Sequence, residues 1–500
     1  MRKISLVIIH CFFFATVTYS QGVGIGTTTP NASAQLDVSA TNKGVLVPRL
    51  ALTAANVASP VSSPADALLI FNTSTSGSGT DAVSPGFYYW SATSSRWTSL
   101  SSSASPEGDV GFGAWGDCSV TAINEYQPAV SNDGMRGDIF GVSVCMSDNF
   151  AIVGAPYDSV GSNAKQGSAY IFSFNGSSWV QQQKLVANDG AGGDYFGYSV
   201  SISGNYAIVG APLDAIGAVT GQGSAYIFFY NGTTWVQQQK ITASDGLADD
   251  HFGFTVAITS SFALIGVKDD DIGANLSQGS SYVYNNNAGV WSQQPRLTAD
   301  DGTANEAFGT SVALSGNYAV IGAYGDGPLG SAYVFFYNGA NWVQKQKLIP
   351  TNPAAQSFGI AVSISGSYIC IGAETTTVGT SNAQGSAFIF FYNGSTWEEQ
   401  QELIAGDGNV NDRFGGKVSV SGNYALIGSI QADVGSNVDQ GATYLFQNAG
   451  GFWIRKQKIT NPSGAAAEFS GNGSVSNNRF IIGNSAFATN RGQVLFGKIK

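Results

Sequence analysis

Residues 196–241 read FGYSVSISGNYAIVGAPLDAIGAVTGQGSAYIFFYNGTTWVQQQKI, and this stretch decides the fold. Two short runs that alternate apolar and polar residues flank Gly204-Asn205, which is the pattern of two strands joined by a tight turn. A third, apolar run ends at Asn231-Gly232, the kind of pair that accepts positive φ in a hairpin turn. A fourth alternating run follows this pair. The stretch therefore predicts a meander of four antiparallel strands.

The same pattern recurs along the chain. A Phe-Gly pair opens each copy, at Phe140, Phe196, Phe252, Phe308, Phe358 and Phe414, and Phe469-Ser470 marks a worn seventh copy. The successive spacings are 56, 56, 56, 50, 56 and 55 residues. Seven units of four strands predict an all-β fold with a seven-bladed β-propeller.

The two ends of the repeated region complement each other. The seventh unit ends in residues 493–500 and has no fourth, Trp-bearing strand. Residues 123–131 precede the first Phe-Gly pair in the register of a fourth strand, because Asn132-Asp133-Gly134 aligns with Asn188-Asp189-Gly190. We predict that this segment completes the last blade and closes the ring, since closure hides sheet edges that would otherwise be exposed.

The composition excludes several classes of protein. The 500 residues include 64 Gly, and only 11% are charged, which rules out a coiled coil or a helical bundle. The net charge of −11 argues against a nucleic-acid partner, because such a protein needs a basic patch. The chain has two histidines, one of them in the N-terminal leader, so histidine-based catalysis and multi-histidine metal sites are nearly excluded.

The N-terminal region divides into two parts. Arg2-Lys3, an apolar run and small residues near Ser20 predict a signal peptide over residues 1–20, and therefore a secreted or surface-exposed protein. No later segment is apolar enough to span a bilayer. Residues 21–105 predict a small β-rich module with a linker, and residues 106–500 the propeller.

The repeats resemble a known family. The Phe-Gly pair followed by Gly154-Ala155-Pro156 or Gly210-Ala211-Pro212 resembles the FG-GAP repeats of integrin α-subunits, in their bacterial secreted variety. This resemblance implies a seven-bladed propeller with a binding or adhesive role. The motifs Gly24-Ile25-Gly26 and Gly44 to Arg49 resemble a leader module common in secreted proteins of Bacteroidetes. Related segments in tail-fibre-like proteins of phages imply self-association through this module.

Acidic residues gather in two of the four loop types. The connections from the second to the third strand and from the fourth to the next first strand are long, so we expect one negative rim that binds ligands and any cations. This candidate rim comprises Asp189, Asp194, Asp214, Asp245, Asp249, Asp250, Asp269, Asp270, Asp271, Asp300, Asp301, Asp407 and Asp412, with Asp433 beside them. Calcium is a possible cofactor because the integrin relatives bind it in propeller loops, although no loop here has the alternating acidic spacing. The alternative is that these acids only keep the protein soluble.

Two further motifs invite functional interpretations. Arg136-Gly137-Asp138 spells the integrin-binding tripeptide, but the next repeat has Gly192-Gly193-Asp194 in the same register, so we interpret Asp138 as a repeat residue. His251 stands near Asp249 and Asp250, as a general base could, yet no nucleophile is evident beside it. We interpret it as a solvated loop residue.

The sequence thus predicts a non-catalytic binding or adhesion protein that recognises an extracellular protein or glycan. Two alternatives stay open: an extracellular enzyme that acts on polysaccharides, and a structural component of a surface layer or matrix.

Overall fold

The computed structural model describes residues 23–25, 36–38, 47–77, 81–83, 86–92, 94–99, 126–461, 464–465, 471–486 and 491–499. The predicted signal peptide, the predicted linker, residues 123–125 and Phe469-Ser470 lie outside these ranges. The chain divides into two compact units, Met1–Cys118 and Ser119–Lys500. All elements in the described ranges are strands, and no helix there could cross a membrane.

The first unit contains two small sheets. Strands β1 (Val23–Ile25) and β2 (Leu36–Val38) pair in parallel. A four-stranded sheet follows, in the order β3 (Arg49–Leu50), β4 (Leu69–Asn72), β5 (Gly86–Ser91) and β6 (Arg96–Ser99).

The described chain has eight four-stranded sheets, and all of them except β3–β6 belong to the second unit. The first three repeats form the sheets β8 (Ser143–Ser147), β9 (Phe150–Ala155), β10 (Ser168–Phe174), β11 (Trp179–Leu185); β12 (Ser199–Ser203), β13 (Tyr206–Ala211), β14 (Ser224–Tyr230), β15 (Trp235–Ile241); and β16 (Thr255–Ile258), β17 (Phe262–Val267), β18 (Ser280–Asn287), β19 (Val290–Gln293).

The next three repeats form the sheets β20 (Ser311–Ser315), β21 (Tyr318–Ala323), β22 (Ser331–Tyr337), β23 (Trp342–Leu348); β24 (Phe358–Ser365), β25 (Tyr368–Ala373), β26 (Ser386–Tyr392), β27 (Trp397–Leu403); and β28 (Phe414–Ser421), β29 (Tyr424–Ser429), β30 (Ala442–Ala449), β31 (Phe452–Ile459). The remaining sheet joins β32 (Asn472–Ser476), β33 (Arg479–Asn484) and β34 (Gln493–Lys498) to β7 (Tyr126–Ala129).

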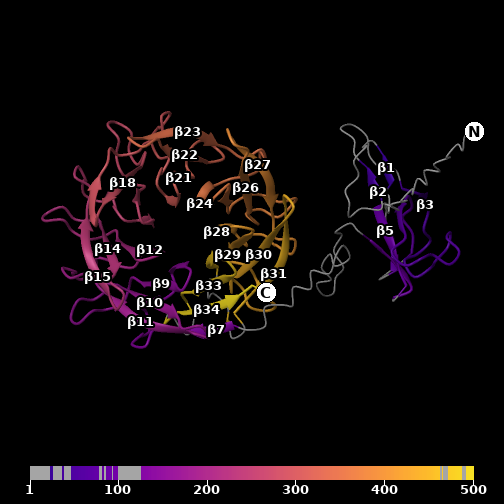
Figure 1. The fold of residues 1–500 in the computed structure, drawn as a ribbon, viewed down its shortest axis with the longest axis horizontal. Helices are drawn as coiled ribbons and strands as arrows, with labels where there is room; N and C mark the ends of the chain where they lie inside the picture. Colours follow the sequence, from indigo (N-terminus) through magenta and orange to yellow (C-terminus); the bar gives the residue numbers. More distant parts are fainter. Residues whose placement is uncertain are drawn as a thin grey trace, which may run out of the picture. The chain divides into compact units, whose positions relative to one another are not determined.

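These repeated sheets are blades of a β-propeller, as the sequence predicts (Figure 1). Each is an antiparallel meander in which the first strand is innermost and the fourth strand is outermost, as β28 and β31 show in Figure 1. The fourth strand bears a tryptophan in every blade except the one that β7 completes. The innermost strand of each blade lies against that of the next, and β32 lies against β8, so the series returns to its start.

Hydroxyl groups join the innermost strands. Ser199 Oγ donates to the carbonyl oxygen of Gly253 in the next blade at 2.8 Å, and Ser201 Oγ accepts from the backbone N–H of Ile258 at 3.2 Å. The alternating serines of residues 199–203 therefore link neighbouring blades, which explains a Ser-rich strand in a region where apolar residues would be expected.

Tryptophan and glutamine join the outer strands. Trp235, 2% exposed, packs in one cluster with Ile152 and Ala169 of the preceding blade. Its backbone N–H donates to Gln183 Oε1 at 2.8 Å, and Gln183 Nε2 donates to its carbonyl oxygen at 2.7 Å. The same pair of hydrogen bonds joins Gln127 to Trp179 and Gln239 to Trp291. The recurrent tryptophans are thus packing residues between blades.

Strand β7 completes the last blade. It pairs antiparallel with β34, and Val494 lies opposite Ala129 and Gly497 opposite Tyr126. Pro128 is tolerated because β7 is an edge strand, where the missing N–H would not face another strand.

The role of β7 gives a first prediction. A chain that begins at Asp133 lacks this strand and leaves the edge of β34 unpaired, so it should unfold at a lower Tm and over a broader range than a chain that begins at Asp117. Thermal unfolding followed by circular dichroism measures both quantities. Equal Tm and equal cooperativity in the two chains would contradict the structural role of β7.

Candidate functional site

The long connections of the propeller carry the acidic residues. In the second blade, the turns at Gly204-Asn205 and Asn231-Gly232 are minimal, whereas residues 212–223 and 242–254 form long loops. We call the face formed by these two types of long loop the loop face.

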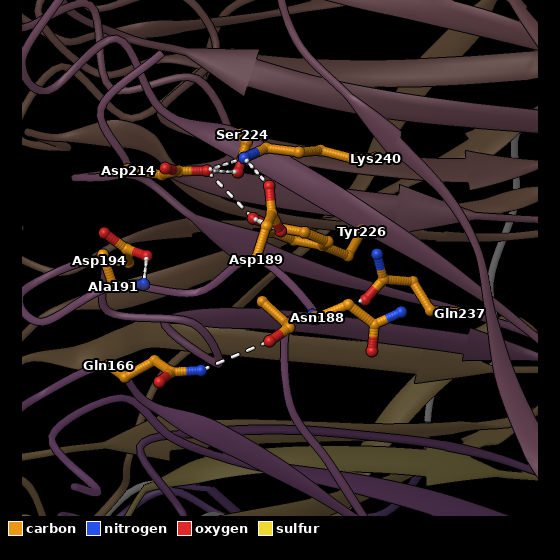
Figure 2. A network of polar contacts seen from close by, with 11 residues as sticks. Gln166, Asn188, Asp189, Ala191, Asp194, Asp214, Ser224, Tyr226, Gln237 and Lys240 are labelled. Atoms are coloured by element: carbon orange, nitrogen blue, oxygen red, sulfur yellow. Dashed lines mark hydrogen bonds and ion pairs between the residues drawn. The ribbon is translucent and has the colours of Figure 1, made fainter. Parts of the chain in front are cut away.

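Several loop-face acids pair with a lysine or an arginine. Lys240 Nζ lies 2.7 Å from Asp189 Oδ2 and 2.7 Å from Asp214 Oδ2. Figure 2 shows the ammonium group between these two carboxylates, with the Tyr226 hydroxyl 3.0 Å from both of them. Ser224 Oγ also donates to Asp214 Oδ2, at 2.5 Å. Because Asp189 precedes the blade and Asp214 lies within it, Lys240 ties two successive repeats together.

Electrostatics and burial act together in this network. The Asp214 side chain is 7% exposed and the Asp189 side chain 51%. Burial alone would lower the pKa of Lys240, but its bonds to the two carboxylates raise that pKa above its usual value. Burial also raises the pKa of Asp189, and the bond and charge of Lys240 more than reverse this, so the net pKa is lowered. Lys240 and Asp189 thus stabilise each other's charged form.

The network repeats in most blades. Lys184 pairs with Asp133 and Asp158, Arg296 with Asp245 and Asp270, and Lys347 with Asp301 and Asp326. Lys458 pairs with Asp407, which Arg455 also contacts.

The fifth blade replaces every member of the network. Thr376, Phe388, Glu402 and Asn352 stand where the second blade has Asp214, Tyr226, Lys240 and Asp189. Asn352 Nδ2 donates to Glu402 Oε1 at 2.9 Å, and Ser386 Oγ donates to Thr376 Oγ1 at 2.8 Å. The replacement set, in which Glu402 takes the place of the lysine, makes its own hydrogen bonds, which indicates that the four positions act as one unit.

A second group of acids caps backbone turns. Asp194 is 5% exposed, and its Oδ2 accepts the backbone N–H of Ala191 at 2.6 Å. Asp250 and Asp412 occupy the same place with Leu247 and Asn409. Burial raises the pKa of all three carboxyls. These acids satisfy buried donors and offer little to a ligand.

The remaining predicted acids differ from one another. Asp269 accepts from His251 Nδ1 and from Lys268 Nζ, both at 2.7 Å. Asp271 Oδ1 accepts the backbone N–H of Ser277 at 2.7 Å. Asp249 and Asp300 are exposed. Most of the predicted rim acids therefore have structural partners, and the side chains of Asp189, Asp245 and Asp301 keep about half of their surface exposed to solvent.

Comparison with known families assigns both units. Six stretches match the model of the FG-GAP repeat, at residues 124–172, 179–228, 235–284, 291–335, 342–390 and 397–446, which together exceed half of the chain. The chain belongs to the FG-GAP repeat family. Residues 24–111 match the model of a phage tail-like trimerisation region. A search of curated proteins found no match.

The FG-GAP repeat is one strand out of phase with the blade. Five of the six matches begin at a recurrent tryptophan, so each covers the outer strand of one blade and three strands of the next. The Lys240 network and the Gln183–Trp235 pairing both cross this boundary.

Metal binding would need a different arrangement of the acids. In the part of the FG-GAP propeller that the structure describes, no group of three or more His, Cys, Asp or Glu side chains is placed to hold a metal ion. Calcium needs six to eight oxygen ligands, whereas Asp189 and Asp214 each already neutralise Lys240. The carboxylates present do not fit a calcium cage.

The integrin-binding tripeptide is structural. Asp138 is 6% exposed, and its Oδ2 accepts the backbone N–H of Met135 at 2.5 Å, as Asp194 does in the next FG-GAP repeat. Its carboxylate is therefore not available as an exposed recognition group.

The loop face of the first three blades also carries an aromatic row that the sequence pattern did not indicate. The rings of Tyr157 and Tyr195 stack with centroids 5.0 Å apart, and Tyr198 and Phe254 lie 5.3 Å apart. The turn at Phe196-Gly197 joins the two pairs, because the backbone N–H of Tyr198 donates to the carbonyl of Tyr195 at 3.1 Å.

Charged groups flank the aromatic row. Lys165 Nζ lies 5.1 Å from the ring centroid of Tyr157, and Lys268 Nζ lies 4.7 Å from that of Phe254. Lys268 in turn reaches the Asp269–His251 pair. Tyr157 and Tyr198 are each 38% exposed. The row thus combines accessible aromatic surface with hydrogen-bonding groups.

One sequence signal points to Tyr195, a member of this row. The residue before each Phe-Gly pair has positive φ in six repeats, yet its identity changes at every copy, through Ile139, Tyr195, His251, Ala307, Ser357 and Arg413. A fixed backbone with variable side chains is the pattern of a recognition surface.

The lysine network gives a second prediction. Lys240→Met leaves Asp214 buried without its counter-ion, so the free energy of unfolding should fall by about 3 kcal/mol. Glu402→Gln at the equivalent fifth-blade position is the matched control and should cost less than about 1 kcal/mol, because the amide still accepts from Asn352. Urea unfolding measures both values, and equal losses would argue against the network.

The pKa of Asp301 gives a third prediction. The hydrogen bond from Lys347 lowers this pKa below the ordinary 3.8. An acid whose folded pKa is lowered stabilises the fold above its unfolded pKa, and this contribution disappears as the pH falls through the folded pKa. Asp301→Asn should therefore lower Tm at pH 6 and make a smaller difference below about pH 3.8.

The adjacent Asp300→Asn is the control for this pH series, since Asp300 is exposed. It should leave Tm nearly unchanged at both pH values. A Tm difference for Asp301→Asn that stays constant down to pH 2.5 would contradict the assignment.

Proposed function

We propose that this protein is a secreted, non-catalytic recognition protein whose FG-GAP propeller binds glycans through the aromatic row on the loop face. FG-GAP propellers often serve extracellular binding and are typically non-catalytic, as is the trimerisation region. The observation that carries the proposal is the accessible row Tyr157–Tyr195–Tyr198–Phe254 with its flanking charges.

The chemistry of the row favours a sugar. A pyranose ring has apolar C–H faces that pack on tyrosine, and hydroxyl groups that bond to carboxylates and ammonium groups. Asp269, Lys268 and His251 supply such groups at one end of the row, and Lys165 supplies an ammonium at the other. Tyrosine also contributes large contact area with little loss of conformational freedom, because it has only two side-chain torsions.

The row is confined to one part of the loop face. The corresponding positions of the fourth blade are Ala307, Thr310 and Gly325, and those of the fifth are Ser357, Ile360 and Thr375. A ligand that needs aromatic contact would therefore bind off-centre, over the first three blades.

We also propose that the N-terminal unit assembles copies of the chain, because residues 24–111 match a trimerisation region. Several propellers in one assembly would raise the avidity for a repetitive glycan even where each site binds weakly.

A glycan array probed with the full chain tests the recognition proposal. Tyr198→Ala should reduce the bound signal at least about tenfold, a loss that corresponds to roughly 1.4 kcal/mol. Tyr324→Ala is the matched control, since Tyr324 is 40% exposed and belongs to the fourth blade. It should retain the signal.

The same array separates the alternatives. Glycans that bind and are recovered intact support recognition, whereas shortened glycans would indicate a polysaccharide-acting enzyme. Binding that Tyr198→Ala does not change would refute the aromatic row as the site, and the absence of any bound glycan would refute the glycan proposal in favour of a protein ligand.

A further inference from the structure

The sheet β3–β6 of the N-terminal unit has two unlike faces. On one face, Ile70, Tyr88, Trp90 and Trp97 are all less than 9% exposed and pack with Leu52 in the unit's buried cluster. This face forms the core of the unit.

The opposite face carries a second apolar block. Leu69 lies opposite Tyr89, and Phe71 lies opposite Phe87, so the four side chains form two adjacent cross-strand pairs. Phe71 and Phe87 meet edge to face with centroids 5.2 Å apart. Phe87 is 45% exposed, and none of the four belongs to the buried cluster. We call Leu69, Phe71, Phe87 and Tyr89 the outer block.

Polar groups border the outer block. Arg49 lies opposite Phe71 on β3, with its guanidinium carbon 5.4 Å from the ring centroid, and Thr98 lies opposite Tyr89 on β6. An apolar centre with aromatic residues and a polar margin is the composition of a protein–protein interface. Phe87 is exposed and Phe71 and Tyr89 are half-buried, so each of the three rings has surface that a partner would bury.

We propose that the outer block is the surface on which copies of this chain meet to form a trimer. The occupant is another copy because the same residues lie within the match to a trimerisation region, residues 24–111. A closed three-fold assembly would place three outer blocks around one axis and remove their rings from water together. This inference rests on the self-association proposed above and names the residues responsible.

Light scattering coupled to size-exclusion chromatography tests the inference on the full chain. The unchanged protein should have three times the mass of one chain. Phe71→Ser with Phe87→Ser should give the mass of one chain at the same concentration. Phe452→Ser is the matched control, because Phe452 is the most exposed aromatic among the described residues of the propeller, at 72%, and its replacement should leave the trimer intact.

A single substitution covers the case in which the double variant does not fold. Phe87→Lys changes the most exposed residue of the block, so a monomer tolerates it, while three lysines near one axis would repel one another. This variant should also have the mass of one chain by light scattering, and the Tm of its propeller should be unchanged.

The outcomes separate the two proposals. If the unchanged protein, the Phe87→Lys variant and the double variant are all trimers, the outer block is not the interface. The proposal that the chain self-associates would still stand. A monomeric unchanged protein at all concentrations would overturn both, without bearing on glycan recognition by the propeller.

Discussion

The close approach of backbones at each blade junction is the constraint on which the propeller depends. Gly197 has φ of +94°, and a Cβ added there would overlap the carbonyl oxygen of Ser168 in the preceding blade. A Cβ at Gly210 would overlap the carbonyl oxygen of Gly253 in the following one. The two glycines, which recur together in the first six repeats, thus let successive blades touch through their backbones, and the adjacent Phe196, fully buried, fills the junction with a ring.

The polar interactions across the junctions follow from this spacing. Ser199 can reach the carbonyl of Gly253 only because the innermost strands lie so close together. Further out, Gln183 bonds to the backbone of Trp235, and at the loop face Lys240 bonds to Asp189 and Asp214, which both lie in the preceding FG-GAP repeat. Contacts at the inner strands, at the outer strands and at the loop face therefore join each repeat to the next. This is consistent with a sequence repeat that takes its first strand from one blade and its other three from the following blade.

This arrangement separates the residues that build the propeller from those free to recognise a ligand. The buried acids and the lysine network use nearly all the recurrent charge of the loop face, so variation is concentrated at positions such as Tyr195 and His251, which share one backbone conformation. Substitution at such positions changes the surface without disturbing the junctions. Tyr195 of the aromatic row lies at such a position, and Tyr198 and Phe254 come directly after Phe-Gly pairs.

The sequence by itself determined the fold class. Four short strands per repeat, Asn231-Gly232 turns and recurrent Phe-Gly pairs required a propeller, because strand alternation and turn residues are local properties that survive any tertiary context. Only the tertiary structure decided what the acids do. Lys240 is 51 residues from Asp189 and 26 from Asp214, and nothing in their spacing shows that one ammonium group bridges both. The same holds for the aromatic row, since Tyr157 and Tyr195 come from loops of different repeats and meet only when the blades pack.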